Sequence, residues 1–121
     1  LVTTDPDYKL SLKLNQLLRF SLKNAAAVEL KDSSGKVQIF SRFSGMSASN
    51  DTAVHLIANR SGKNFLLKTL KNVDYLLLLR EVDNNEDLSL FPGKLKEIES
   101  ITAVFIADLS KLKDKNVKYI L

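Results

Sequence analysis

Leucine residues near the start of the chain recur at the spacing of an α-helix. They stand on one helical stripe: Leu10, Leu14, Leu17 and Leu18. Such a stripe is typical of a helix with one buried side. Asp5 and Pro6 precede it, as an N-cap and a first helical residue do. We therefore predict an amphipathic helix over residues 6–19.

After this helix the apolar residues follow a period of two, which is typical of strands. Residues 27–30 and 37–43 are predicted to form a hairpin, because Gly35 offers the positive φ that a tight turn needs. Residues 44–51 are small and polar and are expected to form a loop. A second hairpin is predicted to pair residues 52–59 with residues 63–67.

A dense leucine run in residues 73–81 favours a central strand that is covered on at least one face. Phe91, Leu95 and Ile98 then share one side of a second, short helix. Three segments with weaker patterns are expected as a strand, a helical turn and a short terminal strand: residues 101–107, 109–115 and 117–121.

These elements predict an α+β fold, with an antiparallel sheet of about five strands and the two amphipathic helices packed on one face. Length and composition fit a single domain over residues 1–121. Residues 1–3 look like the tail of a strand, so an N-terminal strand is expected to be truncated. Four apolar residues are expected to meet the helices in the core: Val37, Ile39, Leu77 and Val104.

Composition removes several kinds of chemistry. The chain has no cysteine, which excludes disulfides, thiolate catalysis and zinc sites that need sulfur. Its longest apolar run, residues 75–79, is far shorter than the roughly 20 residues of a membrane span. We therefore expect a cytoplasmic protein. The net charge of +4 is spread along both halves of the chain, whereas a nucleic-acid footprint clusters it on one face.

Three stretches resemble one known family. Residues 7–15 contain D-Y-K-L followed by L-N, residues 67–75 end in V-D-Y, and residues 95–108 combine a helix and a strand pattern. In these features the chain resembles the IPExxxVDY family of small uncharacterised Bacteroidetes proteins. The resemblance implies a similar fold and a short strand before the first helix. It implies no activity, cofactor or partner.

The naming motif of that family is only partly kept. Its matching positions are Leu67, Val73, Asp74 and Tyr75. Lys68 and Thr69 stand where the family has Pro and Glu, so a role of that glutamate cannot be transferred to this chain.

Several polar residues are candidates for contacts with a ligand. His55 is the only histidine, so a pair of histidine metal ligands is excluded; it is expected to be structural or at the surface, with a general base as the alternative. Asp74 and Tyr75 would point to opposite faces of a strand. We expect Asp74 to bond backbone at the start of the strand and Tyr75 to pack beneath a helix, with ligand contact by Asp74 as the alternative. Asn15 is expected to satisfy a backbone group or to line a pocket.

Phe40 and Arg42 share one face of a predicted strand. If that face is exposed, they could stack on a base and pair with a phosphate, as in proteins that bind single strands. The alternative is a solvated basic surface that binds no ligand.

No catalytic, cofactor-binding or metal-binding set is evident. The leading hypothesis is therefore a non-catalytic module that binds a protein partner or self-associates through a strand edge or an apolar helix face. The alternative is an accessory nucleic-acid-binding protein, and a small-molecule enzyme comes third. The residues expected to contact a partner or ligand are Asp74, Asn15, His55, Phe40 and Arg42.

Overall fold

The computed structural model describes residues 1–31, 34–48, 52–81, 91–105, 114, 116, 117 and 120. In chain order, its elements are β1 (Val2–Thr3), α1 (Asp7–Leu18), β2 (Lys23–Lys31), β3 (Val37–Met46), β4 (Thr52–Ala58), β5 (Arg60–Ser61), β6 (Asn64–Phe65), the 3₁₀ helix η1 (Lys68–Leu70), β7 (Tyr75–Glu81), α2 (Phe91–Leu95) and β8 (Ile101–Ala103).

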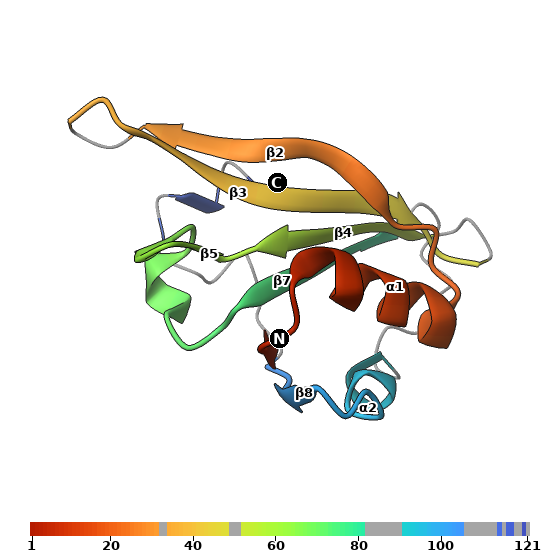
Figure 1. Ribbon diagram of the computed structural model, residues 1–121. Coiled ribbons are helices and arrows are strands. Elements are labelled where there is room, and N and C mark those ends of the chain that lie inside the picture. Colours follow the sequence, from red (N-terminus) through yellow and green to blue (C-terminus); the bar gives the residue numbers. More distant parts are fainter. Residues whose placement is uncertain are drawn as a thin grey trace.

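The main sheet has four antiparallel strands in the order β2-β3-β4-β7 (Figure 1). Two short ladders accompany it: β1 pairs with β8, and β5 pairs with β6. The α+β class is thus confirmed, whereas the single sheet of about five strands is wrong. The predicted strand in residues 1–3 is present as β1, and it leads directly into α1.

Helix α1 matches its prediction closely but is capped differently. Pro6 is the N-cap residue, and no side chain bonds to the first turn as a cap. The role of Asp5 as N-cap is therefore wrong, because its carboxylate binds Lys13 and Ser100 instead. The helix ends at Arg19, which adopts the left-handed conformation with φ 56°.

The first hairpin, β2–β3, is confirmed around Gly35, whose φ is 84°. Strand β3 continues to Met46, so the loop expected from residue 44 begins later. The second predicted hairpin is wrong. Strand β4 pairs with β7 over its whole length, while residues 60–65 form only the small β5–β6 ladder. The long ladder is favoured because it brings two strongly apolar strands together.

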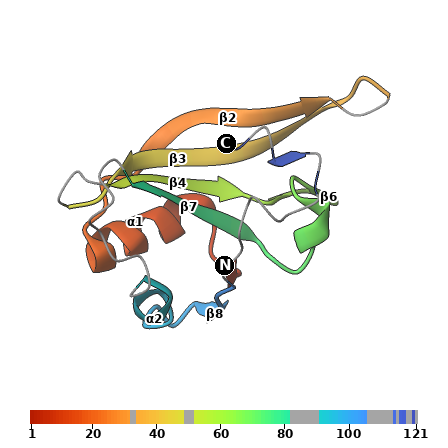
Figure 2. The ribbon, with the colours of Figure 1, turned by 180° about the vertical axis from the view of Figure 1, so that it is seen from behind.

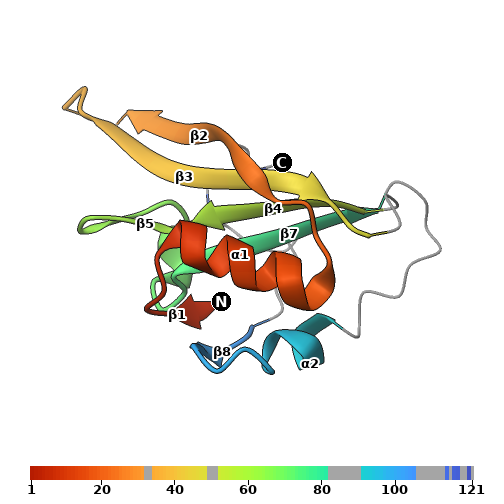
Figure 3. The ribbon, with the colours of Figure 1, turned by 45° about the vertical axis from the view of Figure 1, so that its right-hand side comes forward.

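Apolar side chains on one face of the sheet pack against both helices (Figure 3). Leu10 and Leu14 of α1 are completely buried, and they join Leu95, Ile98 and Val54 in one cluster. Leu17, Leu77 and Val104 are partly buried against the same cluster, as predicted. Helix α2 ends at Leu95 and is therefore shorter than the predicted helix, whose stripe ran to Ile98.

Two residues expected in this core lie outside it. Val37 and Ile39 are 44% and 56% exposed. A helix of twelve residues spans about 18 Å, whereas the ten residues of β3 span about 33 Å. The β2–β3 hairpin therefore extends past the start of α1, where no helix covers it (Figure 1).

The opposite face of the sheet carries a second apolar cluster, and Figure 2 shows the four strands from behind. Its members are Val28, Phe40, Ile57, Leu66, Leu67, Leu78, Val117 and Ile120. The last two come from the end of the chain. Of the terminal strand expected over residues 117–121, only Val117 and Ile120 are described. Both make turn bonds: Val117 N–H donates to the Asp114 carbonyl, and Ile120 N–H donates to the Val117 carbonyl.

Two other predictions fall partly outside the described residues. Strand β8 ends at Ala103, earlier than expected, and residues 106–107 are not described. Of the helical turn expected over residues 109–115, only Asp114 is described. Nothing tests that turn.

Candidate functional site

Asn15 fixes the turn that follows α1. Its Oδ1 accepts a hydrogen bond from the Leu22 N–H at 2.9 Å, and its Nδ2 donates to the Leu22 carbonyl at 3.1 Å. The prediction that Asn15 satisfies a backbone group is confirmed. Both ends of its amide are used in this contact with Leu22.

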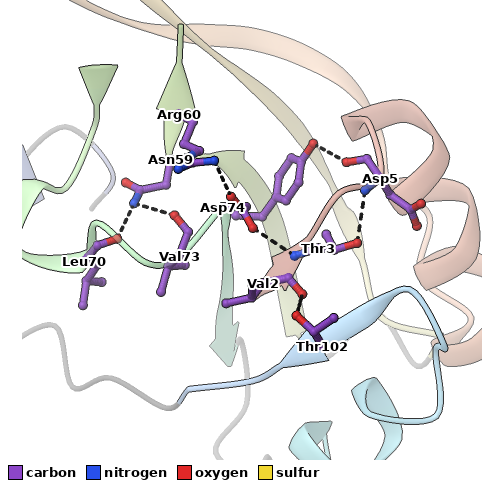
Figure 4. Close-up of polar contacts among 10 residues, drawn as sticks. Val2, Thr3, Asp5, Asn59, Arg60, Leu70, Val73, Asp74 and Thr102 are labelled. Carbon is purple, nitrogen blue, oxygen red and sulfur yellow. Dashed lines mark hydrogen bonds and ion pairs between the residues drawn. The ribbon is translucent and has the colours of Figure 1, made fainter. Parts of the chain in front are cut away.

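Asp74 also bonds backbone, at the start of β7 (Figure 4). Its Oδ2 accepts the N–H of Thr3 at 3.0 Å, and its Oδ1 lies 3.3 Å from the Arg60 guanidinium. The neighbouring Tyr75 packs against the α1 cluster and donates its hydroxyl to the Asp5 carbonyl at 2.7 Å. Burial, helped by the nearby carboxylates, raises the pKa of Tyr75 to about 12. Both residues thus join the N-terminal segment to the sheet.

An open depression with a volume of about 450 Å³ lies over this junction. Its lining residues are Thr3, Thr4, Asp5, Pro6, Ala58, Arg60, Asp74 and Tyr75. Asp74 neutralises the Arg60 guanidinium, which also lies 5.2 Å from the centre of the Phe65 ring. The charged groups in the depression are therefore already paired within the protein.

Asp5 forms a second junction with Lys13 and Ser100. Its Oδ2 accepts from the Lys13 ammonium at 2.7 Å and from the Ser100 hydroxyl at 2.5 Å, and Lys13 also donates to Ser100 at 2.9 Å. These bonds, that from Lys13 first, hold the pKa of Asp5 below its ordinary value. A lysine that activates a serine must be uncharged, and here the ammonium is ion-paired. The contact ties α1 to the turn before β8.

Asn59 was not singled out in the sequence, yet it is completely buried. Its Nδ2 donates to the carbonyls of Leu70 and Val73, and its Oδ1 accepts from the Leu67 N–H at 2.8 Å. Figure 4 shows the two donated bonds. Asn59 therefore shapes the segment between β4 and β7. Nothing in its sequence neighbourhood distinguishes it from a surface asparagine.

A cluster of three basic side chains and one hydroxyl lies on the sheet face opposite α1. Its members are Arg42 and Ser44 of β3, His55 of β4 and Arg80 of β7, which we call the Arg–His face. Ser44 pairs with His55 across β3 and β4, and Arg80 pairs with Ala53, two residues before His55. Because side chains alternate along a strand, all four point to one side of the sheet.

The contacts of the Arg–His face with the described residues use only part of its hydrogen-bonding capacity. Ser44 Oγ lies 2.8 Å from His55 Nδ1, and Arg80 donates one weak bond of 3.3 Å to the Ile120 carbonyl. The Arg42 Nε is buried, with no hydrogen-bond partner among the described atoms. Burial lowers the pKa of His55, and the guanidinium charges of Arg42 and Arg80 lower it further. A neutral imidazole thus lies between two cations.

The structure brings two of the predicted residues, His55 and Arg42, to this face. It places Asn15 and Asp74 at separate structural junctions. Phe40 shares the face with Arg42, as its spacing predicts, but its exposed fraction is 0% because it packs with Ile57 in the second cluster. The expectation that Phe40 is exposed for stacking is wrong. Ser44 and Arg80 were missed, since placing them beside His55 requires the β3–β4 register for Ser44 and the β4–β7 register for Arg80.

The described part of the chain contains no group of three or more His, Cys, Asp or Glu side chains arranged to hold a metal ion. Among the same residues, no helix combines the length and the apolar character needed to cross a membrane.

Comparisons with protein-family models, with curated proteins and with solved structures gave no match. The resemblance to the IPExxxVDY family therefore stays a prediction. Inference about function rests on the geometry of the chain itself.

Proposed function

We propose that this chain is a non-catalytic interaction module that holds a negatively charged group of its partner on the Arg–His face. The proposal depends on one observation. Two guanidinium groups, those of Arg42 and Arg80, flank His55 on one sheet face, and no described carboxylate pairs with either of them. Cations that no described carboxylate neutralises favour an external anion.

The other polar junctions support a non-catalytic role. Asn15, Asn59 and Asp74 each bond backbone groups, and Asp5 is occupied by Lys13 and Ser100. Groups held in this way stabilise the fold. Catalysis would need a nucleophile or a general base that is free to meet a substrate, which these four residues are not.

The surfaces first considered for self-association are less suitable. Strand β2 is an edge of the main sheet, but Lys23 and Lys31 lie at its two ends and its register shifts between Ala25 and Val28. Terminal lysines and a bulge are features that keep edge strands from pairing. Helix α1 exposes Tyr8 and Leu12, an area that is small for a stable interface.

The alternative function, binding of nucleic acid, keeps Arg42 as a phosphate contact but loses its stacking residue. Phe40 is buried, so bases could not stack on it. Binding to this face would then depend on charge alone and would weaken steeply with salt.

The proposal can be tested by titrating ¹⁵N-labelled protein with sodium phosphate, sodium acetate and a hexaglutamate peptide. At least one probe is expected to shift the amide signals of Ser44 and His55. That shift should disappear in Arg42→Gln. Lys63→Gln is the matched control, because it removes one positive charge from the exposed turn between β5 and β6, which is not part of the Arg–His face. No shift with any of the three probes would contradict the proposal.

A further inference from the structure

We propose that the anion taken up by the Arg–His face is a phosphoryl group, either as free phosphate or as the monoester of a small molecule. This inference rests on the proposed function and specifies its ligand. The juxtaposition that carries it is Arg42 and Arg80 on either side of His55, with the Ser44 hydroxyl beside them.

The strand order allows both arginines to reach one ligand. Strands β3 and β7 are the two neighbours of β4, and adjacent strands lie about 4.8 Å apart. Arg42 lies opposite Ile57 and Arg80 opposite Ala53, four residues apart along β4, so the two arginines start about 17 Å from each other, diagonally across His55. Their long side chains can converge over the imidazole from the two sides.

The number of donors matches a phosphoryl group better than a carboxylate. Each guanidinium carries five N–H donors in a planar fork, and toward the described residues Arg80 donates one bond, to Ile120. A carboxylate has two oxygens, so a single fork satisfies it. A phosphoryl group has three terminal oxygens and up to two negative charges, so it can accept both forks and balance both cations.

Two further contacts favour an oxyanion at this place. The Arg42 Nε is buried without a described partner, and a bound oxygen would satisfy it. When Nδ1 of His55 accepts the Ser44 hydroxyl hydrogen, the proton of the neutral ring is on Nε2. That N–H is then available to donate to the ligand.

The test is isothermal titration calorimetry at constant ionic strength with sodium phosphate, phenyl phosphate, sodium acetate, a hexaglutamate peptide and a single-stranded oligonucleotide. Phosphate or phenyl phosphate is expected to bind more tightly than acetate. Arg42→Gln and Arg80→Gln should each weaken that binding by about tenfold or more, the usual effect of losing a charge-assisted hydrogen bond. Lys63→Gln should change it by less than about twofold. Arg80 is exposed, so Arg80→Gln tests the site without disturbing the core.

The outcomes separate this inference from the proposed function. If acetate or hexaglutamate binds as tightly as phosphate and depends on Arg42, the phosphoryl assignment is overturned while the proposed function stands. If no probe binds, both are overturned. Phosphate binding that is unchanged in both arginine variants also overturns the site.

The same experiment identifies the source of the phosphoryl group. Tighter binding of phenyl phosphate than of phosphate supports a small-molecule monoester, and the reverse order supports free phosphate. A single-stranded oligonucleotide that binds this face more tightly than either probe would overturn the assignment to a small ligand.

Discussion

Gly45 is required because two backbone segments approach each other closely. A Cβ atom added there would collide with the Ser21 carbonyl and would lie 2.8 Å from the Leu22 amide nitrogen. The connection from α1 to β2 thus runs directly over this residue. Bonds between Ser21 and Met46 hold the two segments together, so the backbone cannot move away without losing them.

We therefore expect Gly45→Ala to lower the free energy of unfolding by about 1–3 kcal/mol, the usual effect of overpacking. Urea denaturation measures the difference. The control is Gly93→Ala in α2, where a Cβ would meet nothing within 4 Å and the helix propensity of alanine predicts no loss. Equal stability of the two variants would contradict this account of Gly45.

Asn59 shows how strongly one buried polar side chain can determine a loop. Replacing it with alanine leaves the carbonyls of Leu70 and Val73 and the N–H of Leu67 without their partner. Each unsatisfied buried group costs about 1–3 kcal/mol. We expect Asn59→Ala to lose roughly 3 kcal/mol or more in thermal or chemical denaturation. Asn64→Ala, at an exposed position, should change stability by less than about 0.5 kcal/mol.

At this scale the sequence predicts local partners better than exposure. Asn15 was expected to bond backbone because a polar side chain on a partly buried helix face usually satisfies a neighbouring backbone group. Asp74 was expected to do so because it lies at the start of a strand. The prediction that Phe40 is exposed was wrong, because alternation tells which residues share a face and does not tell whether that face is covered. Burial of Phe40 depends on residues far along the chain, such as Leu67 and Val117.

At the scale of elements, α1 was predictable and the partner of β4 was not. A helix is set by local spacing, and its stripe was complete within residues 10–18. The tight turn at Gly62 favoured a hairpin after β4. However, only two pairs of residues follow it, too few to bury the apolar residues of β4. Strand β7 buries them along seven pairs, and a pairing that distant is determined by packing.

The contact of Asp5 with Lys13 and Ser100 joins elements, and its strength should depend on pH. The pKa of Asp5 is lowered from 3.8 in the folded protein, so its ionised form stabilises the fold. This contribution is complete above about pH 3.8 and is lost as the pH falls through the lower folded value. Since Lys13 is one-third exposed, we expect a contribution of about 1 kcal/mol.

Asp5→Asn should accordingly be less stable than the wild type at pH 7, with a difference that shrinks in more acidic solution. Guanidinium denaturation between pH 7 and pH 2 would measure it. Asp7→Asn, which removes the same charge from the first turn of α1, should show a smaller gap. A gap for Asp5→Asn that stays constant with pH would exclude the ion pair as its cause.

For the whole molecule, the main departure from the prediction is that apolar clusters form on both faces of the sheet. The second cluster is closed by the end of the chain. Asn116 donates to the Leu66 carbonyl at 2.7 Å, and the Asp114 carboxylate accepts the Thr69 N–H at 3.1 Å. The sequence pattern did not show this cover, because residues 117–121 are mostly apolar and were interpreted as a short strand.

Asn116 should therefore matter for the stability of the whole protein. Asn116→Ala is expected to lose about 1–3 kcal/mol, because the Leu66 carbonyl remains buried without a donor. Denaturation monitored by circular dichroism measures the loss, and amide exchange at Thr69 should become faster as the cover loosens. Asn72→Ala, at an exposed site, is the control and should alter neither quantity.

The charge of the Arg–His face should also affect the whole molecule. Burial lowers the pKa of His55 from 6.5, and two described charges lower it further, those of Arg42 from β3 and Arg80 from β7. The unfolded chain then takes up a proton at a higher pH than the folded chain. Stability should fall as the pH drops below 6.5, until the folded form is protonated as well. His55→Gln should abolish this slope.

Because His55 is the only histidine, its imidazole proton resonance can be followed without ambiguity during a pH titration. We expect a midpoint below 6.5 in the wild type. Arg42→Gln should raise it, since one repelling charge is gone. Added phosphate should raise it too, because a bound anion stabilises the imidazolium, and Lys63→Gln should leave it unchanged. A wild-type midpoint at or above 6.5 would mean that the two guanidinium groups do not converge on His55, and the geometric basis for the anion site would be lost.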